Sequence, residues 1–330
     1  MTATEPRDHA VFAYFTSKDE VDGEQVRFAR SDGTDLLHWQ ELGGGRPVLV
    51  STVGTGGVRD PFLIRAAGLE GEAAGFYLIA TDLRIRGMDP DTAWTDAQTR
   101  GSRSIVVWES DDLLSWSEPR LAEVAPKEVG SAWAPEAIFD IESQRYFVFW
   151  ASSVPDPEGG AGYNRMLACW TRDFREFTTP FVWVDPGWSV IDATVAEHDG
   201  QFYRVIKDER SSSSELPSAK FLTLEKSAQL DATHYQLVQD GIGSGSPEHG
   251  DALKHGEGPI LTWDQALHRW ILFIDEFTLR GYVPFESPTL DPGHWTMSHD
   301  YRLPAGASHG SILSLTGAEW GRLREIPAAE

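Results

Sequence analysis

The feature that most constrains the fold of this chain is a pattern that recurs about every sixty residues. Each of five copies has a strand end, a polar turn, a short apolar segment and a closing aromatic residue. The closing aromatic residues are Trp39, Trp116, Phe177, Tyr235 and Trp295. WD40 and kelch units are shorter, at roughly 40–50 residues, so this period indicates a propeller with four-stranded blades and long loops.

A second element repeats in the other half of each unit. It begins with an acidic or polar opening to a first strand, continues through a turn and ends in an aromatic-rich second strand. The first strands are expected to open near residues 59, 134, 191 and 257. Runs such as Tyr146 to Trp150 are apolar on both faces, as expected where a sheet lies between two neighbouring sheets.

The fifth copy is divided between the two ends of the chain. His309 and the apolar residues after it supply the first strand of this copy near the C-terminus. Ala10 to Phe15 supply a further strand of it near the N-terminus. The sequence therefore predicts an all-β, five-bladed β-propeller whose N- and C-terminal strands share the last blade, which removes exposed sheet edges. Residues 1–330 are expected to form a single domain, without a long amphipathic helix.

Charge and composition exclude several classes of partner. The chain has 28 Lys and Arg against 51 Asp and Glu, a net charge of -23, which argues against nucleic acid and anionic membranes. No run approaches the roughly eighteen apolar residues of a membrane span. The first nine residues contain no apolar signal core, so a cytoplasmic location is expected. The lone Cys169 is expected to be a buried strand thiol, and the oligomeric state is left open.

Residues that open the first strands of the blades should meet in the central channel, although they are far apart in sequence. They are Asp60, Glu136, Asp192, Glu257 and His309. Each has a structural alternative: a turn cap or salt bridge for the aspartates, a pore-lining group for Glu136, and a water contact for His309. Several carboxylates in one funnel repel one another. Such an unfavourable arrangement is usually retained only where a site needs shifted pKa values.

This set of residue types suits the hydrolysis of glycosides. One carboxyl group must stay protonated to assist the leaving oxygen, and a second, ionised one must activate water or attack the sugar. Trp133 and Trp188 would lie near the rim of the funnel, where aromatic rings can contact a sugar. A small, neutral oligosaccharide is the expected partner.

One motif in each blade resembles glycoside hydrolase family 43. The motifs are Val58-Arg59-Asp60-Pro61, Trp133-Ala-Pro-Glu136, Val190-Ile-Asp192, Glu257-Gly-Pro259 and His309-Gly-Ser311. The resemblance spans nearly the whole chain. It implies a five-bladed propeller acting on arabinans, arabinoxylans, xylo-oligosaccharides or galactans. It also implies Asp60 as general base, Glu257 as general acid and Asp192 as the group that tunes the acid. Inversion would place base and acid roughly 6.5–9.5 Å apart.

The resemblance further implies substrate contacts from Arg59, Trp133, Glu136, Trp188 and His309. Two positions depart from the family pattern: Glu136 stands where Asp is commoner, and Ser308 replaces an Arg that often precedes the histidine. We therefore expect Glu136 to contact sugar without a catalytic role. No cofactor is expected to be required, although some members hold a structural calcium ion in the central channel, near the position of His309.

These observations lead to the hypothesis of an exo-acting, inverting α-L-arabinofuranosidase that releases terminal arabinose from oligosaccharides. A β-xylosidase or β-galactofuranosidase of the same family is the nearest alternative. A fructosidase-like enzyme is less consistent, because its relatives open the first blade with Asn-Asp-Pro and in this chain Arg59 precedes Asp60. A carbohydrate-binding propeller without catalysis is the alternative from another class. Whether residues 86–103 and 239–256 wall the funnel into a pocket is left open.

Overall fold

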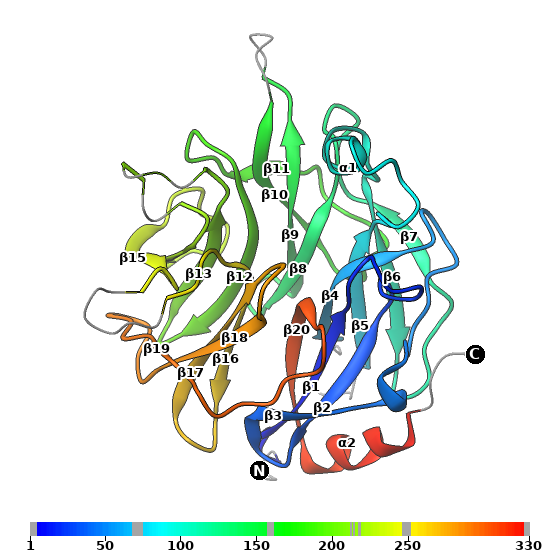
Figure 1. Cartoon of the computed structure of the whole chain (residues 1–330), viewed down its shortest axis with the longest axis vertical. Helices are drawn as coiled ribbons and strands as arrows, with labels where there is room; N and C mark the ends of the chain where they lie inside the picture. Colours follow the sequence, from blue (N-terminus) through cyan, green and yellow to red (C-terminus); the bar gives the residue numbers. More distant parts are fainter. Residues whose placement is uncertain are drawn as a thin grey trace.

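Short strands separated by polar turns build five four-stranded sheets, which stand around a central channel as the blades of a propeller (Figure 1). The computed structural model describes residues 5–67, 75–156, 162–211, 213, 215–216, 219–245 and 252–326. In every sheet the four strands follow one another outwards from the channel, and each pairs antiparallel with the next. The predicted all-β, five-bladed propeller is therefore confirmed.

Four of the blades are continuous in sequence, and their strands run in chain order from the channel outwards. The first blade contains β4 (Val58–Arg65), β5 (Phe76–Asp82), β6 (Ser104–Ser110) and β7 (Arg120–Glu123). The second contains β8 (Trp133–Asp140), β9 (Arg145–Val154), β10 (Tyr163–Thr171) and β11 (Phe181–Val184). The third contains β12 (Val190–His198), β13 (Gln201–Asp208), β14 (Leu222–Ser227) and β15 (Gln236–Ile242). The fourth contains β16 (Glu257–Asp264), β17 (Arg269–Glu276), β18 (Gly281–Ser287) and β19 (Thr296–Met297).

The fifth blade joins the two ends of the chain, as predicted. Its inner strand is β20 (Ser308–Leu315), which pairs antiparallel with β1 (His9–Phe15) and is followed by β2 (Arg27–Asp32) and β3 (Asp35–Glu41). Figure 1 shows β20 in red beside β1 in blue. This pairing closes the ring, because the inner strand of each blade contacts the inner strands of its two neighbours.

The hydrophobic core lies between the blades. One cluster joins Ile79 and Val107 of the first blade to Val148 and Trp150 of the second, all almost completely buried. The middle strands of each sheet are apolar on both faces because both faces are covered. Cys169 of β10 belongs to the same cluster and is fully buried, as predicted.

The repeated turn pattern lies between the third and fourth strands of the blades. After β6, Leu113 turns into the core with a positive φ of 68°, and its backbone N–H donates to the Ser110 hydroxyl. After β10, Phe174 does the same with a φ of 56° and donates to Thr171 Oγ1. In these two blades the apolar residue of the repeat is completely buried at an equivalent turn, which explains its period.

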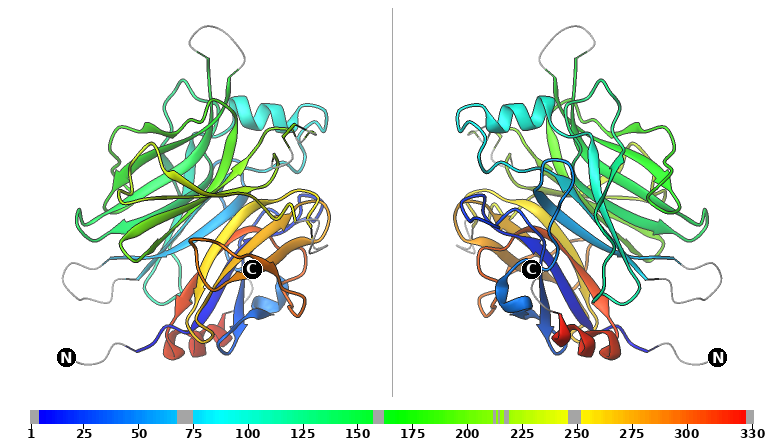
Figure 2. Two further views of the ribbon diagram at one scale, coloured as in Figure 1. Left: turned by 90° about the vertical axis from the view of Figure 1, so that its left-hand side faces the viewer. Right: turned by 90° about the vertical axis from the view of Figure 1, so that its right-hand side faces the viewer.

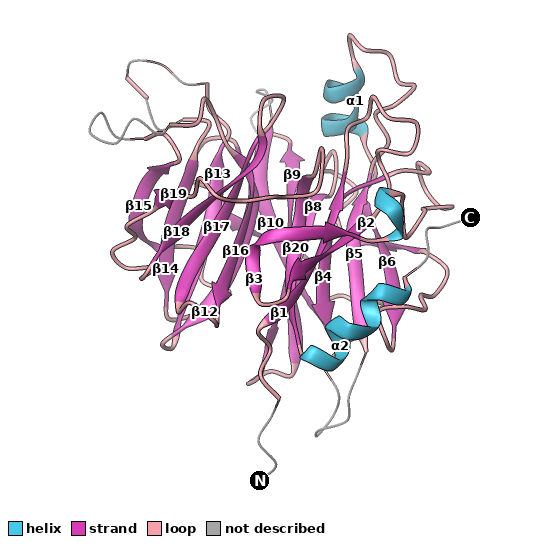
Figure 3. Ribbon diagram, turned by 60° about the horizontal axis from the view of Figure 1, so that its bottom comes forward, coloured by secondary structure: helices cyan, strands magenta, loops and turns pink. Residues whose placement is uncertain are grey.

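Two short helices lie at opposite ends of the molecule (Figure 2), and two 3-10 turns complete the helical structure described. The α1 helix (Ala93–Arg100) falls within the long connection between β5 and β6, and α2 (Gly317–Arg322) follows β20. The turns are η1 (Gly43–Gly45) and η3 (Leu323–Glu325). Figure 3 shows how little of the fold is helical. Among the helices that the structure describes, none has the length and apolar character needed to cross a membrane.

Candidate active site

All five inner strands bulge at the same place, near the end where they begin. Between Arg59 and Phe62 the register of β4 gains one residue against β5, and β8, β12, β16 and β20 show the same shift. A bulge bends a strand and redirects a side chain. The residues at the equivalent position in the five bulges are Asp60, Ala134, Asp192, Gly258 and His309.

The strand registers show that the acids do not all occupy equivalent positions in their blades. Asp60 and Asp192 occupy equivalent positions, with left-handed φ values of 51° and 54°, and His309 lies in the matching bulge. Glu257 comes one residue before its bulge, and Glu136 comes after the bulge of β8. The expectation that all five residues open their strands at matched positions therefore holds for only three of them.

His309 lies between the two aspartates. Its Nδ1 atom is 3.5 Å from Asp60 Oδ1 and 3.8 Å from Asp192 Oδ1. The Gly258 backbone N–H donates to Asp192 Oδ2 at 3.1 Å, which fixes the other carboxylate oxygen. The fold thus brings together, at one end of the channel, Asp60, Asp192 and the backbone beside Glu257.

A hydroxyl from the second strand of the first blade orients Asp60. Thr81 Oγ1 donates to Asp60 Oδ2 at 2.6 Å and accepts from the Ala134 backbone N–H at 2.8 Å. Because Oδ2 is held by Thr81 and Oδ1 faces His309, the carboxylate has a defined orientation. Its side chain is 15% exposed, so one part of the group still reaches solvent.

Glu257 pairs with a buried lysine. Its Oε2 atom lies 2.6 Å from Lys207 Nζ, and the two side chains are 27% and 2% exposed. Burial raises the pKa of Glu257 above its ordinary value, and the Lys207 ammonium partly opposes that shift. Burial likewise raises the pKa of Asp192 against the positive charges of His309 and Lys207. Both acids are therefore easier to protonate than ordinary carboxyl groups.

Two further carboxyl groups are buried close to this layer. Asp275 of β17 is the cross-strand partner of Glu257, and its Oδ1 atom has no hydrogen-bond partner among the residues described. Burial raises the pKa of Asp275 and of Glu136 well above the ordinary range. Glu136 lines a hollow of about 500 Å³ formed by the parts of the inner strands beyond the bulges. The structure therefore does not bring Glu136 to the Asp60 layer, and its contact with sugar stays a prediction.

Arg59 and Trp133 belong to an aromatic wall to which the first, second and fifth blades contribute. The Arg59 guanidinium lies 4.5 Å from the ring centre of Phe15 and 5.0 Å from that of Trp94. It also pairs with Glu24 at 3.2 Å. Trp94 of α1 meets Trp133 edge to face, with ring centres 6.4 Å apart, and is 45% exposed. Residues 86–103 thus contribute a helix and an exposed tryptophan to this wall.

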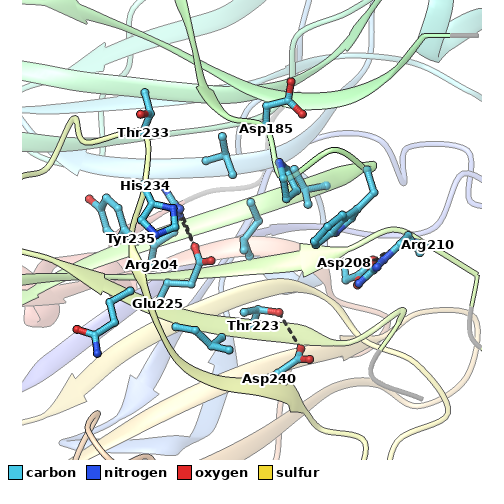
Figure 4. Close-up of a pocket in the computed structure, with 17 residues that line it drawn as sticks. Asp185, Arg204, Asp208, Arg210, Thr223, Glu225, Thr233, His234, Tyr235 and Asp240 are labelled. Carbon is cyan, nitrogen blue, oxygen red and sulfur yellow. Dashed lines mark hydrogen bonds and ion pairs between the residues drawn. The ribbon is translucent and has the colours of Figure 1, made fainter. Parts of the chain in front are cut away.

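A hollow lies along the third blade, beside β11 (Figure 4), and not at the carboxylates. It measures about 760 Å³, and none of Asp60, Asp192 and Glu257 lines it. Trp188 lines it instead, with the Arg210 guanidinium 4.0 Å from the centre of its ring. Carboxyl groups with shifted pKa values indicate a catalytic site more directly than the volume of a hollow does. A sugar contact from Trp188 therefore stays a prediction.

The channel offers calcium no evident set of ligands. Calcium takes six to eight oxygen atoms, but among the described residues no group of three or more His, Cys, Asp and Glu side chains is arranged to hold a metal ion. Within the same part of the chain, the carboxylates in ion-pair contact with His309 are those of Asp60 and Asp192. The structural calcium ion expected near His309 therefore stays a prediction.

Three residues of this site escaped the sequence analysis: Thr81, Lys207 and Trp94. Thr81 and Lys207 stand on second strands, whose side chains are expected to be core. Lys207 is the penultimate residue of β13, which continues to Asp208. A lysine directly after the apolar pair Val205-Ile206 was the available signal. Whether residues 239–256 wall the funnel stays open, because residues 246–251 lie outside the described part of the chain.

Comparison with known proteins supports one family. The protein-family model described as "Probable glycosyl hydrolase domain", of the group related to family 43, matches residues 5–321. A protein of Bifidobacterium longum subsp. longum named alpha-L-arabinofuranosidase is 32% identical over 293 residues, which cover 80% of this chain. The chain spans only 27% of that relative's length.

Solved structures share the fold at low sequence identity. A thermostable family-43 glycoside hydrolase has a TM-score of 0.52 at 18% identity, over 79% of this chain and 80% of its own. The arabinobiose complex of an α-L-arabinanase from Penicillium chrysogenum has a TM-score of 0.51 at 17% identity, over 88% of this chain and 76% of its own. At these identities the likeness shows the propeller alone. Because the family model matches nearly the whole sequence, the chain belongs to the glycosyl hydrolases related to family 43.

Proposed function

We propose that this protein is an exo-acting, inverting α-L-arabinofuranosidase that releases terminal arabinose from oligosaccharides. The observation that carries the proposal is the meeting of Asp60, Asp192 and Glu257 at one end of the channel, around His309 and Gly258. The sugar is inferred from the relative named alpha-L-arabinofuranosidase, which is similar to most of this chain.

In this reaction Asp60 is the general base. Its ionised carboxylate accepts a proton from a water molecule while the water oxygen attacks the anomeric carbon of arabinose. The hydrogen bond from Thr81 leaves Asp60 Oδ1 as the oxygen that can take the proton. Since Thr81 is held in turn by the Ala134 N–H, the base has little freedom to turn away from the water.

Glu257 is the general acid. It donates its proton to the glycosidic oxygen as the bond to the anomeric carbon breaks, so the leaving sugar departs as an alcohol. Burial raises the pKa of Glu257, and the negative charge of Asp192 favours its protonated form further. After one turnover Asp60 holds a proton and Glu257 has lost one, and exchange with solvent restores both.

The decisive variant is Glu257→Gln, which removes the transferable proton and keeps the size of the side chain. Turnover of arabino-oligosaccharides should fall by about a hundredfold or more, as for loss of a general acid, because their alcohol leaving group needs the proton. Turnover of nitrophenyl α-L-arabinofuranoside should fall less, because nitrophenolate leaves without protonation. Glu118→Gln, at an exposed position, is the matched control and should retain activity. Full activity of Glu257→Gln would contradict the proposal.

The sugar and the stereochemistry need separate measurements. A panel of nitrophenyl glycosides should show preference for the α-L-arabinofuranoside over the β-xyloside and the β-galactofuranoside. Proton NMR of the first product should show the β anomer of arabinose if the reaction inverts. Release of arabinobiose or longer fragments in place of single arabinose residues would exclude an arabinofuranosidase that removes terminal arabinose one residue at a time.

A further inference from the structure

We propose that Lys207 is a positioning residue that sets how readily Glu257 gives up its proton, and that Glu209 moderates Lys207 from the far side. The inference rests on the proposed function, since it concerns the residue assigned there as general acid. It assigns a role to a buried cation that the proposed reaction does not itself use.

The geometry forms a chain of alternating charges. Lys207 Nζ lies 2.6 Å from Glu257 Oε2 and 2.7 Å from Glu209 Oε2. Glu209 Oε1 lies in turn 2.5 Å from Lys220 Nζ. The Lys207 ammonium also lies 4.7 Å from the ring centre of Phe277, which covers it. One buried cation is thus shared between the acid at the channel and an acid behind it.

A buried lysine needs compensation, because removing an ammonium from water costs several kcal/mol. One carboxylate at 2.7 Å, that of Glu209, already supplies a close partner. The second contact, to Glu257, has a cost for catalysis because a nearby cation favours the ionised form of an acid. Burial of Glu257 acts in the opposite direction. The two effects together keep the proton on Glu257 labile.

The other groups facing Glu257 come from three elements. Asp192 of β12 and Asp275 of β17 act on it as negative charges when ionised. His309 of β20 packs against the next residue, Gly258, where an added Cβ would lie 2.9 Å from its ring. Among these described neighbours Lys207 makes the ion pair with Glu257, so its removal should have the largest single effect.

The test uses two variants that should act in opposite directions. In the proposed reaction the alkaline limb of kcat/KM against pH reports loss of the proton from the acid. Lys207→Met removes the cation, so this limb should move up by about one to three pH units. Glu209→Gln leaves Lys207 with Glu257 as its charged partner, so the limb should move down by a smaller amount. A residue with a merely structural role would lower activity without shifts of opposite sign.

Two controls separate local from general effects. Lys226→Met removes a lysine that pairs with Asp291 on the surface of β14, and should leave the limb in place. Lys207→Arg keeps the charge and should keep the limb close to that of the native protein. Circular dichroism and thermal unfolding identify any variant that does not fold. If Lys207→Met does not fold, the downward shift in Glu209→Gln carries the test.

A measurement that needs no turnover distinguishes failure of the proposed function from failure of the proposed role of Lys207. Carbon-13 NMR of glutamate-labelled protein, with the Glu257 signal assigned by its loss in Glu257→Gln, reports the pKa of this carboxyl group directly. It should rise in Lys207→Met and fall in Glu209→Gln. If Glu257→Gln remains active but the NMR shifts occur, the proposed function is wrong and the coupling stands. Unchanged or parallel shifts in the two variants overturn the role of Lys207.

Discussion

Replacement of Gly258 by alanine tests whether close packing under the carboxylates holds the site together. Gly258 has a φ of +55°, a conformation that side chains rarely adopt. A Cβ atom built there would lie 2.9 Å from His309 Cγ and 3.0 Å from His309 Cβ. These atoms are next to the His309 backbone, so the histidine could not move aside by bending a flexible side-chain end.

The expected loss of stability has two parts. A left-handed conformation costs a non-glycine residue about 1–2 kcal/mol, and overpacking a filled region costs about 1–3 kcal/mol more. Gly258→Ala should therefore lower the free energy of unfolding by about 2–5 kcal/mol. Gly200→Ala is a matched control, because its φ is +69° and an added Cβ meets nothing within 4 Å. Gly200→Ala should lose only the about 1–2 kcal/mol that the left-handed conformation costs.

Urea unfolding of both variants measures the difference, and kcat/KM for an arabinofuranoside measures the effect on the site. Displacement of His309 should misplace Asp60 and Asp192, which it separates, and a misplacement near 1 Å can lower activity about a hundredfold. Gly200→Ala should keep native activity. Equal losses of stability in the two variants, together with native activity in Gly258→Ala, would refute this reasoning.

Three further predictions concern other parts of the molecule. Trp94→Ala should raise KM for oligosaccharides by about fivefold and leave kcat unchanged, because a stacking contact contributes about 1 kcal/mol; an unchanged KM would remove Trp94 from the substrate path. Burial raises the pKa of the Cys169 thiol to about 12, so a thiol reagent at pH 8 should react only as the protein unfolds. Although burial opposes it, the ion pair with Arg65 lowers the pKa of Glu319 to about 2. The stabilisation by Glu319 is therefore full above about pH 4.5 and is lost as pH falls towards 2. Thermal unfolding should accordingly show a Glu319→Gln deficit at pH 7 that shrinks below pH 4.5, and a deficit independent of pH would contradict the ion pair.

Much of the fold could be predicted because its signals are local and repeated. The apolar residues at Leu113 and Phe174 fill equivalent turns, so the repeat in the sequence is a repeat in the structure. The pairing of β1 with β20 followed from a divided fifth copy. Asp60 and Asp192 were recognised for the same reason, since each stands at the equivalent position of its blade.

The displacement of Glu257 and Glu136 along the channel, relative to Asp60, could not be predicted in this way. The bulge that separates them from the Asp60 layer is defined by pairing with the second strand, at Asp275 and Phe149 respectively. The bulged residue itself is Asp, Ala, Gly or His in different blades, so no residue type marks it. Cross-strand register, and not local sequence, decides how far along the channel each acid lies.

The sequence by itself therefore determined the five blades, their closure and the residues that enter the channel, because each depends on a pattern within one repeat. The tertiary structure decided the environment of those residues. Lys207 reaches Glu257 across fifty positions of sequence, and Thr81 joins Asp60 to Ala134 of the next blade. Such contacts depend on how neighbouring blades pack, and burial between them is what shifts the pKa values of Asp192 and Glu257.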